Sequence, residues 1–194
     1  MIPAAYAYTG RMKTGGSKMK KNGGQYVPNV RRLTHAAIIA AIYAALTVLL
    51  APISFAQQQV RVAEALSVLP AFMPAAVPGL FVGCLLANVV SAFGLPDIIF
   101  GSLATLLSAL LTRAAARFLE GRSLILRVLI IPFPAVAVNT VVIGAMLSVI
   151  ADIPFPAAAL GVMAGQALSC YGLGAPLYVA MHKYMERTGR RYDL

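Results

Sequence analysis

The chain has 194 residues, of which 60% are hydrophobic and only 11% are charged, a balance that excludes an ordinary soluble domain. Its net charge of +10 would suit a nucleic-acid binder, but the basic residues stand at the ends of apolar stretches without interleaved aromatic residues. The sequence therefore predicts an integral membrane protein that lies in the lipid bilayer and binds no nucleic acid.

The basic residues indicate the orientation of the chain in the membrane. Fifteen of the sixteen Lys and Arg residues fall before Thr34, between Arg113 and Arg127, or after His182. Such residues collect on the cytoplasmic side of membrane proteins, so the three clusters predict three cytoplasmic segments, and both termini are among them. The exception is Arg61.

The two ends of the chain differ in composition from its middle. Residues 1–31 are rich in Gly, Lys and Asn and lack the apolar core of a secretory signal, so we expect a disordered, basic cytoplasmic tail. Residues 185–194 are expected to form a basic C-terminal tail. Residues 32–184 are predicted to be one membrane domain.

The apolar stretches of this domain predict an all-α bundle of about six transmembrane helices. Prolines and glycines divide the stretch 62–111, so we expect three short or tilted helices there. Four spans before the loop between Arg113 and Arg127 and two after it keep both termini on one side. A two-plus-two arrangement also does so, but it would make residues 62–111 one overlong helix. The six predicted helices are 33–52, 62–75, 78–93, 97–112, 128–150 and 155–181.

Small residues line the first of these helices at helical spacing. They form two adjacent i, i+4 ladders, namely Ala36, Ala40, Ala44 and Ala37, Ala41, Ala45. Small residues allow a second helix to approach closely. The strip is predicted either to pack within the molecule or to dock a partner membrane subunit, and the spacing leaves both open.

Polar side chains interrupt the apolar stretches, mostly toward the predicted outer side. A charge at membrane depth costs roughly 2.5–3.5 kcal/mol on insertion scales, so it needs a partner or a function. Arg61 and Glu64 are three residues apart and are predicted to pair on one helix, with Arg61 holding Glu64 in place. Together the polar groups predict a pocket for a flat, hydrogen-bonding solute. They include Arg61, Glu64, Asn88, Asp97, Asn139, Gln166 and Tyr171.

Several kinds of chemistry have no support in the sequence. There is no phosphate-binding G-x-x-x-x-G-K-[ST] loop and no H-E-x-x-H zinc motif, and no histidine stands on the outer side to activate a nucleophile. We therefore expect no enzymatic activity, no metal and no cofactor. Cys84 and Cys170 lie in apolar sequence and are expected to be small packing residues.

Five blocks of sequence carry a resemblance to a known family. The two specific blocks are Arg-Val-Ala-Glu-Ala-Leu at 61–66 and Asp-Ile-Ile-Phe-Gly-Ser-Leu-Ala-Thr-Leu at 97–106. The more generic blocks are 51–55, 83–88 and 169–174. Over residues 33–184 the chain resembles the QueT family of substrate-binding S components of energy-coupling factor (ECF) transporters.

The resemblance implies a six-helix protein of the plasma membrane. It would capture a queuosine precursor from outside, either a 7-deazaguanine base such as the 7-aminomethyl or 7-cyano form, or queuine. It would deliver this solute by toppling against a transmembrane T component driven by two cytoplasmic ATPases. The resemblance also favours the partner role for the alanine strip.

A deazaguanine would give the polar residues specific roles. Its N1–H and exocyclic amine are two parallel donors that Glu64 could accept together, and Asp97 could face a cationic aminomethyl group. Amides would serve the ring carbonyl and ring nitrogens, and an aromatic ring would stack on the base. These residues are Asn88, Asn139, Gln166, and Tyr171 or Phe55.

Two other functions remain open at this point. An S component for another vitamin or small solute would use the same architecture. A structural or signalling membrane scaffold would explain the alanine strip, but it would not explain the convergence of outer polar groups and predicts no saturable binding of a small molecule.

Overall fold

The computed structural model describes residues 30–54, 60–91 and 93–189, and this part of the chain forms helices joined by turns, without a β-strand. The predicted all-α fold is therefore confirmed. The expectations for the terminal tails concern largely residues outside the described part, and the one for Phe55 lies wholly outside it.

Several helical segments follow one another without a break. Continuous apolar helices run over Asp97–Phe118, Leu124–Ile150 and Phe155–Thr188, and with the first helix these are the described helices long and apolar enough to cross a membrane. Two apolar helices are shorter. The segments are α1 (Val30–Leu49), α2 (Ala51–Ser54), η1 (Val62–Ala71), α3 (Ala76–Asn88), η2 (Asp97–Gly101), α4 (Ser102–Phe118), α5 (Leu124–Ile130), α6 (Phe133–Ile150), α7 (Phe155–Ala167), η3 (Leu168–Gly174) and α8 (Ala175–Thr188).

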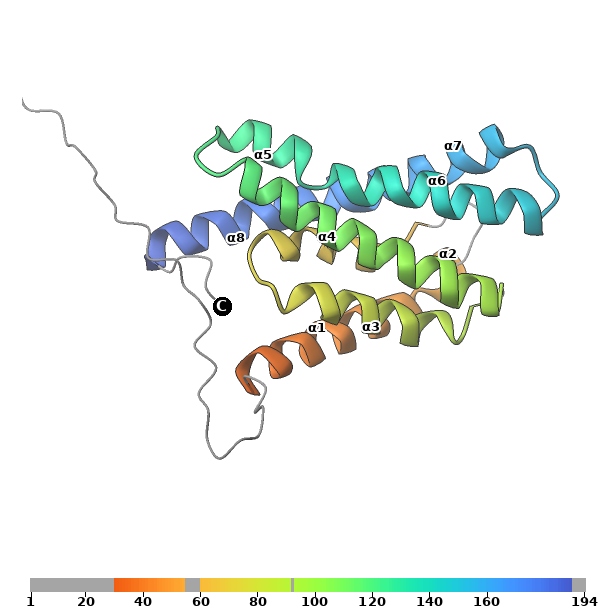
Figure 1. The fold of residues 1–194 in the computed structure, drawn as a ribbon, viewed down its shortest axis with the longest axis horizontal. Coiled ribbons are helices and arrows are strands. Elements are labelled where there is room, and N and C mark those ends of the chain that lie inside the picture. The colour runs from red at the N-terminus through yellow and green to blue at the C-terminus, as the bar shows by residue number, and fades with distance from the viewer. Residues whose placement is uncertain (1–29, 55–59, 92, 190–194) are drawn as a thin grey trace, which may run out of the picture.

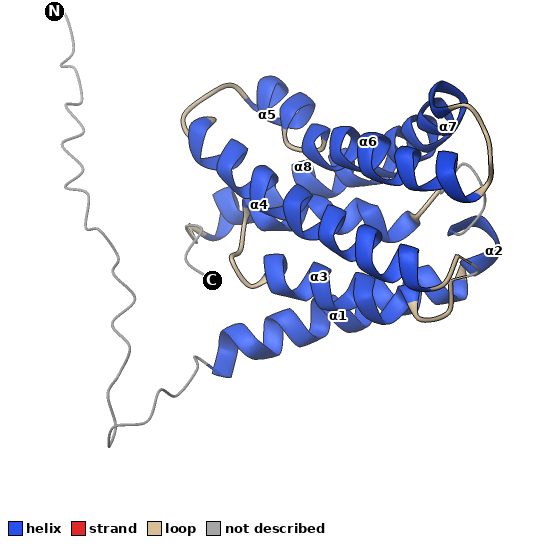
Figure 2. Ribbon diagram, turned by 45° about the vertical axis from the view of Figure 1, so that its right-hand side comes forward, coloured by secondary structure: helices blue, strands red, loops and turns tan. Residues whose placement is uncertain are grey.

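The helices run back and forth along the long axis of the molecule (Figures 1 and 2). The start of α1, the turn between α4 and α5 and the end of α8 lie at one end, which we call the basic end. The opposite end, called the far end, holds α2, the connection from α3 to α4 and the turn between α6 and α7. Apart from Arg61, the described Lys and Arg residues belong to the elements that meet at the basic end: Arg31, Arg32, Arg113, Arg117, Arg122, Arg127, Lys183 and Arg187.

The helices extend further toward the basic end than the sequence predicted. α4 continues to Phe118 and α5 begins at Leu124, so the turn is 119–123 instead of the whole stretch from Arg113 to Arg127. Alanines between the arginines favour helix, and long Arg side chains can reach the interface from helical positions. α8 likewise continues to Thr188 and ends before Gly189, whose φ of 62° is typical of a helix C-cap.

The alanine strip of α1 is divided between two environments. A Cβ atom on Gly79 or Gly83 of α3 would lie 2.8 Å from the carbonyl oxygen of Ala36 or Ala40, so these glycines allow the backbones of α1 and α3 to touch. The ladder that begins with Ala36 therefore packs within the molecule. The ladder of Ala37, Ala41 and Ala45 is exposed.

The short 3₁₀-helix η1 lies inside the bundle, where it contacts α1, α4, α8 and η3. Most of its side chains are buried, and Glu64 is among them. η1 ends just after Pro70, which cannot donate a backbone hydrogen bond. This central segment carries a carboxylate into the interior, where the polar side chains of the neighbouring helices meet it.

Candidate substrate site

Glu64 is held by a tyrosine from the first helix. Tyr43 of α1 is completely buried, and its hydroxyl donates a 2.6 Å hydrogen bond to Oε1 of Glu64. The other carboxylate oxygen, Oε2, is buried and has no hydrogen-bond partner among the described residues. A buried oxygen without a donor is costly in free energy, so Oε2 is an acceptor available to a bound solute.

Arg61 forms a different ion pair from the predicted one. Its Nη2 donates to both carboxylate oxygens of Asp97 at 3.0 Å, and the two side chains are only 3% and 0% exposed. Arg61 lies before η1 with extended backbone, so the helical i, i+3 spacing that suggested pairing with Glu64 does not apply. The role predicted for Arg61, holding Glu64 in place, is therefore replaced by a bond between the start of η1 and η2.

The Arg61–Asp97 pair is supported on both sides. On one side, Nη1 of Arg61 lies 3.8 Å from the sulfur of Cys84. The Ser91 hydroxyl donates a 2.5 Å hydrogen bond to Oδ2 of Asp97. The charges of Arg61 and Asp97 therefore compensate each other within the protein.

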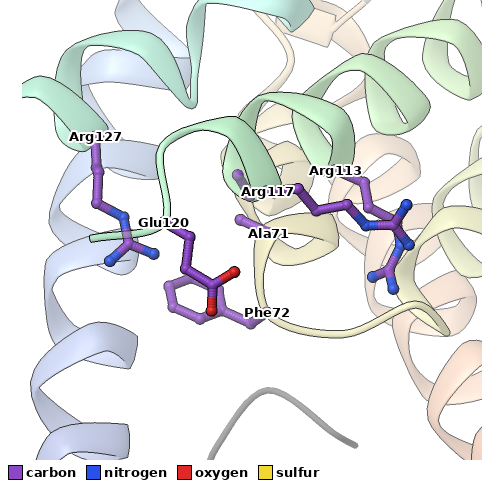
Figure 3. A pocket seen from close by; sticks show the side chains of 7 residues that line it. Ala71, Phe72, Arg113, Arg117, Glu120 and Arg127 are labelled. Carbon is purple, nitrogen blue, oxygen red and sulfur yellow. The ribbon is translucent and has the colours of Figure 1, made fainter. Parts of the chain in front are cut away.

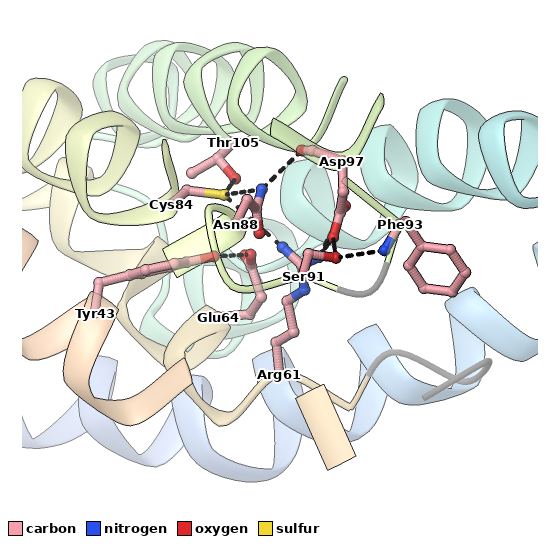
Figure 4. Close-up of polar contacts among 9 residues, drawn as sticks. All are labelled: Tyr43, Arg61, Glu64, Cys84, Asn88, Ser91, Phe93, Asp97 and Thr105. Carbon is pink, nitrogen blue, oxygen red and sulfur yellow. Dashed lines mark hydrogen bonds and ion pairs between the residues drawn. The ribbon is translucent and has the colours of Figure 1, made fainter. Parts of the chain in front are cut away.

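Asn88 and Cys84 of α3 extend this cluster toward α4 (Figure 4). Nδ2 of Asn88 donates to the Asp97 carbonyl oxygen at 2.8 Å and lies 3.4 Å from the sulfur of Cys84. The Thr105 hydroxyl donates to the same sulfur at 3.2 Å. Cys84 is buried, as expected of a packing residue, but it also accepts hydrogen bonds. Oδ1 of Asn88 is buried with no partner among the described residues, which makes it a second available acceptor.

Glycine at position 101 makes room for this arrangement. A Cβ atom on Gly101 would lie 2.6 Å from Nδ2 of Asn88 and 3.2 Å from Oδ1 of Asp97. A larger residue would therefore displace the asparagine side chain. The sequence block 97–106 thus contributes both the carboxylate of Asp97 and, through Gly101, the space beside it.

A second polar group adjoins η1 from the other side. Nδ2 of Asn139 in α6 donates to Oε1 of Gln166 in α7 at 3.3 Å, and both side chains are buried. The sulfur of Cys170 lies 3.8 Å from the same Gln166 oxygen and 3.7 Å from the Glu64 carbonyl oxygen. The two predicted amides therefore meet next to the segment that carries Glu64.

Tyr171 lies apart from these groups. Its hydroxyl donates to the Leu129 carbonyl oxygen at 2.7 Å, and its side chain lines a lateral depression beside Val128 and Pro176. The neighbouring Cys170 points into the bundle, which leaves Tyr171 on the outer face. The structure thus brings together Arg61, Glu64, Asn88 and Asp97, and separately Asn139 and Gln166, but not Tyr171.

Sequence reasoning missed three members of the cluster: Tyr43, Ser91 and Thr105. Hydroxyl groups are common in membrane helices, and nothing in their spacing distinguished these three. Tyr43 carried a usable signal, because it is the sole aromatic residue of α1 and a buried tyrosine hydroxyl usually has a hydrogen-bond partner.

Charged and amide side chains buried together among apolar helices define a polytopic membrane protein with a polar centre for a small solute. A model of the QueT transporter family matches residues 33–183, and the chain belongs to this family. The predicted resemblance is thereby confirmed, and the protein is a transporter component for a small substrate. Searches of curated proteins and of solved structures found no match.

Proposed function

We propose that the protein is the S component of an ECF importer in the plasma membrane and that it binds a queuosine precursor at the cluster around Glu64. Membership of the QueT transporter family supports the transport role. The observation that carries the substrate class is the buried carboxylate of Glu64. One of its oxygens is fixed by Tyr43, and the other has no partner among the described residues.

This carboxylate suits the edge of a guanine-like base. A 7-deazaguanine presents N1–H and an exocyclic amine as two parallel donors, and a carboxylate can accept both in bidentate fashion. The bond from Tyr43 sets the orientation of the carboxylate before the solute arrives, so little conformational freedom is lost on binding. A hydrogen bond to a charged group is worth about 1.5–3 kcal/mol, and its loss is therefore measurable.

Neighbouring groups complete the proposed site. Oδ1 of Asn88 is a further buried acceptor, and the Asn139–Gln166 pair adds amide groups on the other side of η1. Asp97 already accepts from Arg61 and Ser91, so a cationic aminomethyl group at C7 would compete with Arg61 for this carboxylate. Comparison of the aminomethyl and cyano bases measures that competition directly.

Delivery of the solute requires a partner, because the sequence contains no ATP-binding loop. We propose a transmembrane T component that works with two cytoplasmic ATPases. The exposed ladder of Ala37, Ala41 and Ala45 supports this docking, since the other ladder of α1 is already covered by α3. In this orientation the basic end faces the cytoplasm and the far end receives the solute.

Equilibrium binding to the purified protein in detergent tests the proposed substrate. The ligands are 7-aminomethyl-7-deazaguanine, 7-cyano-7-deazaguanine, queuine and guanine, with riboflavin and thiamine as controls. We expect saturable binding of at least one deazaguanine and a loss of roughly 10- to 100-fold in Glu64→Gln. The matched control is Glu186→Gln, which removes an exposed carboxylate at the basic end and should leave the affinity unchanged.

Two results would contradict the proposal. A monodisperse, helical sample that binds none of the deazaguanines would refute this substrate class, and binding of riboflavin or thiamine instead would indicate a different vitamin. Equal affinity in wild type and Glu64→Gln would show that Glu64 does not contact the solute.

A further inference from the structure

A separate cavity lies at the basic end of the bundle, remote from the cluster around Glu64. It has a volume of about 240 Å³ and is bounded by the end of η1, the end of α4, the turn 119–123 and α5. Its polar lining is strongly cationic. Among the described residues that line it, the charged ones are Arg113, Arg117, Glu120 and Arg127, which are three guanidinium groups and one carboxylate.

The arginines of this cavity are positioned by the fold. Arg127 is only 8% exposed, and its guanidinium lies 5.9 Å from the centre of the Tyr178 ring in α8. Nη1 of Arg113 lies 3.5 Å from the Pro70 carbonyl oxygen at the end of η1. In Figure 3 the side chains of Arg113 and Arg117 extend from α4 on one side of the turn, and the side chain of Arg127 extends from α5 on the other.

The general tendency of basic residues to collect on the cytoplasmic side does not account for a cavity. Arg31 and Arg32 at the start of α1 illustrate that tendency, because both are exposed. In contrast, Arg113, Arg117 and Arg127 line one concave space, and Arg117 lies close enough to Arg113 to disfavour its charge. Like charges held close together repel each other, and a bound anion relieves that repulsion.

We propose that this cavity binds a phosphate group, of the kind carried by the headgroup of an anionic phospholipid. Guanidinium groups form paired hydrogen bonds with phosphate oxygens, and basic pockets between membrane helices hold anionic headgroups in this way. Exposed apolar side chains stand next to the cavity residues in sequence: Phe118 is 86% exposed and Ile125 is 75% exposed. They offer a surface to acyl chains, which favours the lipid over soluble phosphate as the source.

Retention of lipid by the purified full-length protein tests this site. The protein is taken from bilayers of equal phosphatidylglycerol and phosphatidylcholine into native mass spectrometry, and the bound lipids are counted. We expect retained phosphatidylglycerol, reduced at least about tenfold in the double variant Arg113→Gln/Arg117→Gln. The matched control Arg31→Gln/Arg187→Gln removes the same charge from exposed positions at the same end and should retain the lipid within about twofold of wild type.

A single variant provides a second readout that does not depend on removing arginines. Glu120→Gln removes the one carboxylate among the described residues that line the cavity, so it should increase retention of phosphatidylglycerol. Equal retention of the two lipids, equal loss in both arginine variants, or no gain in Glu120→Gln would each overturn the proposal. Inorganic phosphate at millimolar concentration distinguishes the sources. Displacement of the lipid would assign the site to soluble phosphate, and no displacement would assign it to the headgroup.

Discussion

The two ends of the bundle differ in the balance of their positive and negative charges. Toward the far end, the cation of Arg61 and the anion of Asp97 are both buried and neutralise each other, and nearby buried oxygens of Glu64 and Asn88 have no donor among the described residues. At the basic end, the described residues that line the cavity supply three guanidinium groups and one carboxylate. The first region therefore offers hydrogen-bond acceptors without an excess of charge, whereas the described lining of the second carries an excess of positive charge.

Breaking the buried ion pair should have the largest effect. Arg61→Gln leaves Asp97 buried without its cation, which should lower the free energy of unfolding by about 3–5 kcal/mol. Arg113→Gln at the basic end should cost less than about 1 kcal/mol. Unfolding in detergent, followed by circular dichroism, compares the two. The double variant Arg61→Gln/Asp97→Asn should recover part of the loss, and equal stability of Arg61→Gln and wild type would contradict the buried pair.

A methyl group beside the cluster should have the next largest effect. In Gly101→Ala the new Cβ lies 2.6 Å from Nδ2 of Asn88, so overpacking should cost about 1–3 kcal/mol and also weaken solute binding. Gly172→Ala is the matched control, since its nearest neighbour would be Cδ1 of Leu168 at 3.7 Å. Thermal unfolding and binding are measured on both variants. Equal behaviour of the two would show that the space at Gly101 is not needed.

Loss of the tyrosine hydroxyl should affect binding more than folding. Tyr43→Phe removes the donor to Oε1 of Glu64, worth about 1.5 kcal/mol, and should weaken deazaguanine binding about tenfold. Tyr171→Phe removes a hydroxyl that donates to the Leu129 carbonyl oxygen away from the cluster, and should leave the affinity unchanged. Titration calorimetry measures both. An unchanged affinity in Tyr43→Phe would show that the Tyr43 hydroxyl does not contribute to binding of the solute.

A change in ionic strength should have the smallest effect on binding of the solute, but it should weaken retention of the lipid at the basic end. Raising salt shortens the screening length from about 10 Å at 0.1 M to about 3 Å at 1 M, which weakens interactions between exposed charges. Binding of the neutral 7-cyano base should change less than about twofold, because the cluster is buried. Retention of phosphatidylglycerol should fall over the same range. A reversed pattern of salt dependence would contradict the distinction between the two ends.

Much of this arrangement could be predicted from the sequence, because a polar group in an apolar stretch must be satisfied within the protein. That reasoning identified Glu64, Asn88 and Asp97, which the fold gathers, and Asn139 with Gln166, which hydrogen-bond to each other. The segregation of the basic residues was also readable, since it depends on short-range sequence context alone.

The remaining features depend on how the helices meet. Arg61 and Asp97 are far apart in sequence, and only the folded structure, in which the Arg61 side chain reaches Asp97 at the start of η2, shows that Asp97, and not Glu64, is the partner of Arg61. The alanine strip had two possible uses. It serves one of them within the molecule only because Gly79 and Gly83 lie opposite Ala36 and Ala40. Whether a ladder of small residues packs within the molecule depends on the helix opposite it, so the sequence of α1 alone does not predict it.

In the proposed function, the position of Tyr43 on α1 would link binding of the solute to binding of the partner subunit. The helix presents Tyr43 to Glu64 on its inner face and the ladder containing Ala41 on its exposed face. A partner that docks on the exposed face and turns α1 would change the Tyr43–Glu64 bond, and with it the affinity for the solute. Linkage is reciprocal, so an occupied site must change the affinity for that partner by the same factor. In the proposed function, α1 would thereby couple occupation of the solute site to the affinity for the partner subunit.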